Sequence, residues 1–370
     1  MRIGVPKEIK NHEYRIGMTP IAVREATAHG HQVFVQKDAA VRIGLSDDDY
    51  IKAGAKILPT AAEIFETADM VVKVKEPQPA ECKMLRAGQT LFTYLHLAPD
   101  PEQAKALQAS GCTAIAYETV TNARGGLPLL APMSEVAGRM SIQAGAHCLE
   151  IAQGGRGALL GGVSGVAPAK VVVLGAGVSG VNAAVMAVGL QADTTILDIN
   201  VGRLAEVKLA LPAVKTLYST RAAIEHEIME ADLVIGAVLV PGAAAPKLIS
   251  EAQVKKMKRG AVLVDISIDQ GGCFETSHAT THAEPTFIKH DVVHYCVANM
   301  PGAVARTSTF ALNNATLPFL LALADKGPKA AMLTDPHLLN GLNVHKGQIT
   351  HAAVAEALGS KFVDPKVALA

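Results

Sequence analysis

The sequence lacks the features that mark membrane, secreted or nucleic-acid-binding proteins. Lysine plus arginine and aspartate plus glutamate both total 34, so the charge balance gives no reason to expect nucleic acid or a membrane surface as a partner. The most apolar internal run, Leu233 to Ala245, is 13 residues long and contains glycine and proline, which is too short to span a bilayer. Tryptophan is absent, while alanine and glycine are frequent, which favours close helix packing or a buried subunit interface.

Cysteine is also scarce, and its placement gives no framework of disulfides. The five cysteines contain no C-x-x-C pair, and an odd number cannot all be paired. The first residues contain no long apolar core of a signal peptide. We therefore expect reduced thiols and a cytoplasmic protein.

No set of residues predicts a metal site. His278 and His282 are four residues apart, which on a helix would place two imidazoles on one face. The neighbouring Thr280, Thr281 and Pro285 argue against a stable helix there, and no nearby cysteine or glutamate completes a ligand set. We expect no bound metal.

What the sequence does have is a glycine pattern between a strand and a helix. The apolar run Val171–Val173 leads into Gly175-x-Gly177-x-x-Gly180 and then into a helix of small residues. Gly175 allows the tight turn, Gly177 lets the backbone approach a pyrophosphate, and Gly180 lets helix and strand pack closely. A second strand, 194–198, ends in an acid 18 residues after Gly180, placed to accept from a ribose 2′-hydroxyl and to repel a 2′-phosphate. The sequence therefore predicts NAD binding.

Length and the alternation of strand and helix signals predict two α/β domains. At 370 residues the chain exceeds the usual size of a single core. A long helix is expected from Ser134, as its N-cap, through Gln153, and another from Phe310 to Leu323. We expect two doubly wound Rossmann-like domains joined by long helices, the first discontinuous (1–127 with 306–370) and the second at 128–305. The expected strands are 2–5, 31–36, 70–75, 90–96, 112–118, 170–174, 194–198, 232–236, 261–265 and 292–297.

Several long motifs resemble the bacterial NAD-dependent L-alanine dehydrogenases. The resemblance runs from Met1 to the C-terminal helices. Two related groups share the fold and part of these motifs: the NAD(H)-binding alpha subunit of proton-translocating transhydrogenase, and the lysine-forming saccharopine dehydrogenases. The matching motifs are Gly4–Lys10, Glu13–Gly17 with Thr19-Pro20, Val74–Pro77, Thr93–Ala98, Ala131–Gly138 and Asp265–Gly272.

The resemblance implies reversible oxidative deamination of L-alanine to pyruvate and ammonium, with NAD as hydride acceptor. It also implies a homohexamer. A transhydrogenase subunit would hold NAD(H) for a partner without amino-acid chemistry, and usually carries a docking loop or membrane segments that are not seen here. A saccharopine-type enzyme would need room for a larger substrate.

The resemblance assigns the substrate to two basic residues. Arg15 matches the arginine that holds the substrate carboxylate, for which a planar guanidinium is well suited. Lys75 matches the lysine that contacts the substrate oxygens. Lys73, two residues earlier on the expected strand, shares its face, so spacing alone leaves both open.

The resemblance assigns proton chemistry to two further residues. His96 follows an apolar strand and would exchange protons with the amine and the carbinolamine. Asp269 lies in a glycine-containing loop and would orient or activate the water. Asp265 is the rival by position, but its place within a strand favours a structural role.

The remaining matches are to residues that contact NAD in the family. At one of these positions, near the adenine end, this sequence has His278 where several family members have an arginine. The expected contacts are Ser134, Gly175, Gly177, Val178, Ser179, Gly180, Asp198, Arg203, Thr220, Val238, Leu239, Ile266, Ser267, Ile268, Asp269, His278, Val297, Ala298, Asn299 and Met300.

Overall fold

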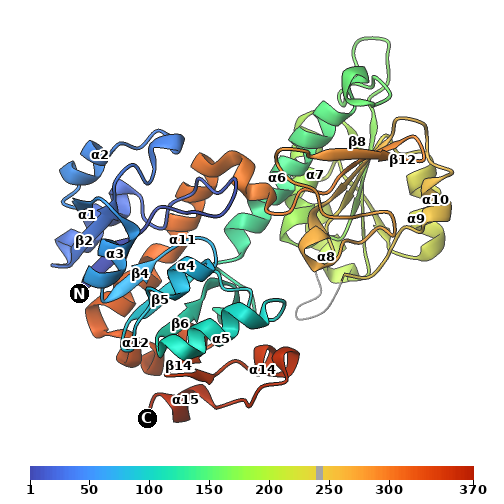
Figure 1. Ribbon diagram of the computed structural model, residues 1–370. Helices are drawn as coiled ribbons and strands as arrows, with labels where there is room; N and C mark the ends of the chain where they lie inside the picture. The colour runs from blue at the N-terminus through green and yellow to red at the C-terminus, as the bar shows by residue number, and fades with distance from the viewer. Residues whose placement is uncertain (239–244) are drawn as a thin grey trace. The chain divides into compact units, whose positions relative to one another are not determined.

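The computed structural model describes residues 1–238 and 245–370, which form two compact units (Figure 1). Unit 1 comprises Met1–Met133 and Val304–Ala370, and unit 2 comprises Ser134–Ala303. Each unit is built on its own sheet, whose parallel strands alternate with helices. The expected fold class, two doubly wound α/β units, is confirmed.

The sheet of unit 1 has eight strands in the order β15-β14-β6-β5-β4-β1-β2-β3. The strands β1 to β6 pair in parallel, while β14 and β15 are antiparallel additions that the sequence patterns did not reveal. The order changes direction between β1 and β4, and such a switch point is where α/β sheets bind ligands, beyond the carboxyl ends of the strands. The bounds are β1 (Arg2–Val5), β2 (Gln32–Gln36), β3 (Lys56–Leu58), β4 (Met70–Val72), β5 (Thr90–Thr93), β6 (Thr113–Ala116), β14 (Leu342–His345) and β15 (Gln348–Ile349).

The helices of unit 1 bury apolar side chains against this sheet. Phe65, Leu107 and Val354, from α3, α5 and α14, belong to one buried cluster with Val71 and Leu91 of the sheet. The helices are α1 (Pro20–Ala28), α2 (Asp47–Lys52), α3 (Ala61–Thr67), α4 (Pro79–Cys82), α5 (Pro101–Ser110), α11 (Ala305–Lys326), α12 (Pro328–Thr334), α13 (Pro336–Leu339), α14 (Ala352–Leu358) and α15 (Pro365–Ala368), with short 3-10 turns η1 (Val41–Ile43) and η2 (Tyr117–Thr119).

The sheet of unit 2 has seven strands in the order β12-β13-β11-β10-β7-β8-β9. Counted from β7, the parallel strands run outward to β9 on one side and from β10 to β13 on the other, which is the Rossmann strand order. The strand β12 is antiparallel and was not expected. The bounds are β7 (Lys170–Leu174), β8 (Asp193–Asp198), β9 (Lys215–Tyr218), β10 (Leu233–Gly236), β11 (Val262–Asp265), β12 (Thr286–Lys289) and β13 (Val292–Tyr295).

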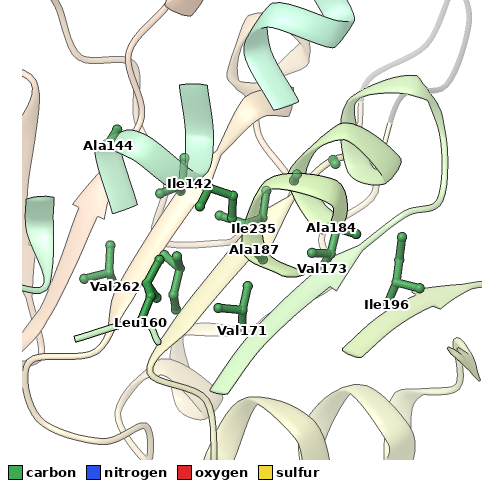
Figure 2. Packing of buried hydrophobic residues seen from close by; sticks show 14 of the residues in the cluster. Ile142, Ala144, Leu160, Val171, Val173, Ala184, Ala187, Ile196, Ile235 and Val262 are labelled. Carbon is green, nitrogen blue, oxygen red and sulfur yellow. The ribbon is translucent and has the colours of Figure 1, made fainter. Parts of the chain in front are cut away.

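Small residues let the helices of unit 2 lie close to the sheet (Figure 2). Ile142 of α6 and Ala184 and Ala187 of α7 pack over Val173 and Ile235. Helices α9 and α10 supply buried side chains to a second cluster on the opposite sheet face. The helices are α6 (Ala131–Cys148), α7 (Val178–Gly189), α8 (Val201–Ala210), α9 (Arg221–Met229) and α10 (Glu251–Val254), with 3-10 turns η3 (Ile151–Gln153), η4 (Ile266–Gln270) and η5 (Met300–Val304).

Helix α6 differs from its expected form. It begins at Ala131, so Ser134 lies inside its first turns and is not the N-cap. The reason is Pro132, which needs no N–H partner at the second helical position and therefore starts the helix there. The helix ends at Cys148, and the 3-10 turn η3 follows before Gly154 turns left-handed at φ 87°.

Three strands of unit 1 are shorter than expected. Strand β4 ends at Val72 and β5 at Thr93, whereas the sequence pattern continued to Lys75 and His96; β6 ends at Ala116. After β4 and β5, carboxylates take up backbone N–H groups, as described below. Within the described part of the chain, no helix is both long enough and apolar enough to cross a bilayer.

Candidate active site

Polar side chains gather where four neighbouring strands of unit 1 end. Strands β1, β4, β5 and β6 are adjacent and parallel, so their carboxyl ends lie at one edge of the sheet. The chain places Glu8 after β1, Lys75 after β4, His96 after β5 and Glu118 after β6. This edge includes the β1–β4 switch point, so it is the ligand-binding edge expected for an α/β sheet.

Glu8 joins the ends of β1 and β4. Its Oε1 accepts the backbone N–H of Val74 at 2.7 Å and that of Lys75 at 3.4 Å, and its Oε2 accepts from the Nζ of Lys73 at 3.0 Å. The N–H groups of residues 74 and 75 thus bond to a side chain, while the carbonyl of Val74 still accepts the N–H of Tyr94 at 3.2 Å.

Lys73 and Lys75 have different environments, contrary to the expectation that they share a strand face. Lys73 is fully buried, and its Nζ lies 3.0 Å from Glu8 and 2.8 Å from Glu81. Burial lowers the pKa of Lys73, but the two carboxylates outweigh this and raise it, so the ammonium stays charged. The alternation argument fails because β4 ends at Val72. Lys75 has a 13% exposed side chain, with its Nζ 3.8 Å from Glu76.

Glu118 holds the backbone at His96. Its carboxylate accepts the N–H of His96 at 2.6 Å and the N–H of Leu95 at 3.1 Å. His96 adopts a left-handed conformation with φ 49°, and its side chain is 43% exposed. Its ring stacks on that of Tyr94, with centroids 5.7 Å apart and planes 6° apart. The imidazole therefore stands on a buried aromatic ring with one edge open to solvent.

Arg15 is buried and held by Glu13. The Nε and Nη2 of Arg15 donate to the two oxygens of Glu13 at 2.7 and 2.5 Å, and Nη1 contacts the sulfur of Met133 at 3.1 Å. Burial alone would lower the pKa of Arg15, but Glu13 outweighs it and raises the pKa. A bidentate pair of this kind fixes the plane of the guanidinium.

Tyr94 lies within the electrostatic range of Arg15 and is itself buried. Its hydroxyl donates to the carbonyl of Leu129 at 2.5 Å, and burial raises the pKa of the phenol. Tyr94 is therefore a neutral donor with its proton engaged, and its ring supports His96.

The glycine loop of unit 2 has the geometry that its spacing predicts. Gly175 has φ 100°, and a Cβ there would lie 2.6 Å from the carbonyl oxygen of Ala237. A Cβ on Gly180 would lie 1.8 Å from the oxygen of Gly175, so only glycine fits between turn and helix. Gly177 caps α7, and a Cβ there would meet no atom within 4 Å. The space beside Gly177, at a helix N-terminus, fits a phosphate group.

Around this loop, Asp198 ends β8 and is tied to the glycine turn. One Asp198 oxygen accepts the N–H of Ala176 at 2.6 Å and the other that of Asn200 at 2.8 Å. The Nε of Arg203 donates to the carbonyl of Ala176 at 2.8 Å. Val178, which is exposed, and Ser179, which is partly buried, begin α7, and Thr220 is the N-cap of α9.

Asp269 is exposed on the short turn η4, which follows β11. The preceding residues 266–268 belong to the same turn, and the hydroxyl of Ser267 donates to the carbonyl of Val238 at 2.7 Å. Asp265 is fully buried and accepts from Ser267, Cys273 and Ser277, which supports its structural role. Leu239 lies outside the described residues.

The last expected contacts follow β13. Asn299 turns left-handed at φ 62°, and Met300 begins η5. His278 stacks on Phe287 of β12, with centroids 3.8 Å apart. His278 therefore lies beside β12 and β13, whereas Asp198 ends β8. The contact of His278 with the adenine stays a prediction. Residues 278–282 are not helical, and no described group of three or more His, Cys, Asp or Glu side chains is arranged to hold a metal.

Three acidic residues at this edge of unit 1 were not expected: Glu8, Glu13 and Glu118. Each is at most partly exposed, and each fixes one of the basic residues predicted from the sequence or the backbone that carries it. Glu8 and Glu118 shared a signal, since each follows the carboxyl end of an apolar strand. Only the strand order puts them beside their partners.

The strand order and the glycine loop define unit 2 as a Rossmann-type dinucleotide-binding domain. Residues 4–137 match the family model "Alanine dehydrogenase/PNT, N-terminal domain", and residues 141–352 match "Alanine dehydrogenase/PNT, C-terminal domain". An alanine dehydrogenase from Halomonas elongata is 59% identical over 365 residues, which cover 98% of each chain. The chain belongs to the alanine dehydrogenase/PNT family, and the resemblance noted in the sequence is confirmed.

Two solved structures are similar over almost the whole chain. A structure of an L-alanine dehydrogenase has a TM-score of 0.94 at 52% identity and covers 97% of this chain and 99% of its own. A transhydrogenase from Sinorhizobium meliloti has a TM-score of 0.82 at 24% identity, covering 95% of this chain and 100% of its own. The second match shows the fold alone.

Proposed function

We propose that this protein oxidises L-alanine to pyruvate and ammonium, reversibly, with NAD as the hydride acceptor. The observation that carries the proposal is the carboxyl edge of the unit 1 sheet, where Lys75 and His96 follow the adjacent strands β4 and β5. Arg15 of the same unit is buried and held by Glu13. The chain is 59% identical to an alanine dehydrogenase over nearly its whole length, and it acts on alanine as that relative does.

Arg15 and Lys75 hold the substrate. A carboxylate binds a guanidinium in a planar fork, and Glu13 fixes the plane of this one in advance. Lys75 contacts the substrate oxygens and stabilises negative charge that grows on them during the reaction. Lys75 is proposed for this role in preference to Lys73 because the ammonium of Lys73 is buried between two carboxylates.

His96 and Asp269 move protons and orient water. The amine must be neutral before a hydride leaves Cα, and His96, next to the carboxylate of Glu118, accepts the proton. Asp269 orients the water, which loses a proton as its oxygen bonds to the imine carbon. The nitrogen of the resulting carbinolamine takes a proton from His96, and the C–N bond breaks as the hydroxyl proton is lost, giving the pyruvate carbonyl and ammonia, which leaves as ammonium.

The glycine loop and the acid after β8 hold the dinucleotide. The backbone at Gly177 takes the pyrophosphate, and Asp198 accepts from the ribose 2′-hydroxyl. When bound, NAD supplies the hydride acceptor for the Cα–H bond. The further cofactor contacts proposed are those given above, including Ser134, Arg203 and Thr220.

The remaining parts of the proposal are homohexameric assembly and a role in alanine catabolism in the cytoplasm. These rest on the family relationship and on five buried, unpaired cysteines, which suit a reducing compartment. Light scattering coupled to size-exclusion chromatography tests the assembly.

The deciding experiment is NADH formation with a panel of amino acids. We expect L-alanine to be oxidised fastest, with no turnover of D-alanine or saccharopine. Turnover of saccharopine and not of L-alanine would support the saccharopine-type alternative. NADH binding without turnover of any amino acid would support a transhydrogenase-like subunit.

A further inference from the structure

Lys247 contacts the loop that carries Asp269. Its Nζ donates to the carbonyl oxygens of Gly271 at 2.6 Å, Gly272 at 2.8 Å and Phe274 at 3.2 Å. A lysine ammonium has three N–H donors and no acceptor, so three carbonyls satisfy it completely. Most surface lysines have no such set of acceptors, so the contact needs an explanation.

The backbone around Lys247 lies alongside the same loop. The N–H of Ala245 donates to the carbonyl of Gln270 at 3.0 Å, and that of Leu248 donates to Cys273 at 2.7 Å. The loop itself contains two successive left-handed glycines, Gly271 at φ 89° and Gly272 at φ 74°. The N–H groups of both glycines close the end of η4, that of Gly271 donating to the carbonyl of Ile268 and that of Gly272 to the carbonyl of Ser267, each at 3.0 Å. The carbonyls of the two glycines have no partner within η4, and Lys247 binds them.

Asp265 holds the N–H groups of this loop, as Lys247 holds its carbonyls. The carboxylate of Asp265 accepts from the N–H of Ser267 at 3.0 Å and from that of Cys273 at 2.9 Å. A Cβ on Gly272 would lie 2.7 Å from Asp265, so the loop passes close to this carboxylate. The exposed Asp269 stands between these attachments.

We propose that Lys247 is a positioning residue: its ammonium fixes the turn of residues 271–274 and thereby the orientation of the Asp269 carboxylate. The inference rests on the proposed catalytic role of Asp269. Lys247 acts only through the loop backbone. A misplacement of about 1 Å in a reacting group can lower a rate by about 100-fold. Loss of the hydrogen bonds from Lys247 to the loop can therefore slow the reaction even though Lys247 does not touch the substrate.

The test uses the full-length protein with L-alanine and NAD. Lys247→Met keeps the aliphatic stem and removes the ammonium, and the exposed Lys256→Met in the same unit is the matched control. We expect Lys247→Met to lower kcat by about 10- to 100-fold, while Lys256→Met stays at the wild-type value. Amide hydrogen exchange of residues 266–274 should become faster in Lys247→Met.

A double-mutant cycle separates positioning from a general structural effect. If Lys247 acts through Asp269, adding Lys247→Met to Asp269→Asn should cost little beyond Asp269→Asn alone. Alkylating a Lys247→Cys variant with 2-bromoethylamine rebuilds an ammonium at the same reach and should restore kcat. The native cysteines are buried, and burial raises the pKa of the Cys82, Cys148 and Cys296 thiols, so they react slowly.

The proposal is overturned if Lys247→Met behaves like Lys256→Met, if the two losses multiply, or if aminoethylation restores nothing. A different result marks failure of the proposed function. If Asp269→Asn keeps the wild-type kcat, the catalytic role of Asp269 is wrong. Amide hydrogen exchange of residues 266–274 then tests whether Lys247 fixes the loop. Faster exchange in Lys247→Met supports this role, and unchanged exchange overturns it.

Discussion

One oxygen of Glu118 accepts the backbone N–H of His96 at 2.6 Å and lies 3.9 Å from Nδ1 of the same residue. The left-handed conformation of His96 costs a non-glycine residue about 1 kcal/mol or more. The carboxylate offsets this cost through two backbone hydrogen bonds, and it also presents a negative charge to the imidazole. Glu118 therefore fixes where the ring stands.

Replacing Glu118 should impair turnover more than binding of the dinucleotide. We expect Glu118→Ala to lower kcat/KM for L-alanine by about 100-fold, within the range of lost acid–base catalysis. Glu118→Gln keeps an acceptor for the N–H groups, so the difference between the two variants measures the part of the loss due to charge. Glu102→Gln, on an 85% exposed side chain of α5, is the control. Wild-type turnover in Glu118→Ala would contradict the role.

The two lysines near the end of β4 should fail in different ways. Lys75→Ala removes a contact to the substrate, so we expect a loss of about 100-fold in kcat/KM with unchanged unfolding. Affinity for NADH, measured by fluorescence, should also stay the same, because Lys75 does not hold the dinucleotide.

Lys73→Ala should instead destabilise the protein. It leaves the carboxylates of Glu8 and Glu81 facing each other without a buried counter-charge, and breaking such a pair costs about 3–5 kcal/mol. Thermal unfolding of both variants checks this. A stable but inactive Lys73 variant beside an active Lys75 variant would reverse the assignment of the two residues.

Gly177 should matter for the cofactor and not for the fold. Its backbone is accessible to any residue (φ −68°), and a Cβ there meets no atom within 4 Å. Gly177→Ala should therefore unfold like the wild type but bind NADH at least about tenfold more weakly, because the Cβ takes the space of a phosphate. Gly189→Ala, at an equally open position later in α7, is the matched control. Equal NADH affinity in both variants would place the pyrophosphate elsewhere.

Asp198 should decide the preference for NAD over NADP. Its charge repels a 2′-phosphate, so we expect NAD to be used about 100-fold more efficiently or better. Asp198→Asn keeps an acceptor for the N–H groups of Ala176 and Asn200. Because the variant lacks the negative charge, its kcat/KM for NADP should lie closer to that for NAD. The ratio of kcat/KM for the two cofactors is the measurement, and an unchanged ratio in the variant argues against this residue.

His294 should make the protein less stable as the pH falls. Burial lowers its pKa from 6.5 to about 4, while its ring nitrogens bond to Thr276 and Val292. Between these pH values the unfolded chain binds a proton that the folded chain does not, so stability falls as the pH drops from 6.5 to about 4. The loss from this group is about 3 kcal/mol. The measurement is the free energy of unfolding in urea at a series of pH values between 6.5 and about 4. In His294→Gln this free energy should fall less steeply with decreasing pH than in the wild type, whereas the exposed control His147→Gln should behave like the wild type.

Local patterns predicted much of unit 2. The close approach of Gly180 to the carbonyl of Gly175 lies within six positions of the chain, so the spacing of the glycines was sufficient to predict this turn. The antiparallel strands β12, β14 and β15 were missed. Strand β14 pairs with the distant strand β6, which no local period records, whereas β12 and β15 are short hairpin partners of β13 and β14.

By itself, the sequence determined the family and the fold class, because these depend on contiguous motifs. The tertiary structure decided which of Lys73 and Lys75 is buried in an ion-pair cluster and how the backbone at His96 is held. Lys73 is neutralised by Glu8 and Glu81, and His96 is turned by Glu118. These partners are distant in sequence or on a different strand, and only the parallel order of β1, β4, β5 and β6 brings their carboxyl ends to one edge. A charge is buried or available according to its neighbours in space, and the strand order sets those neighbours.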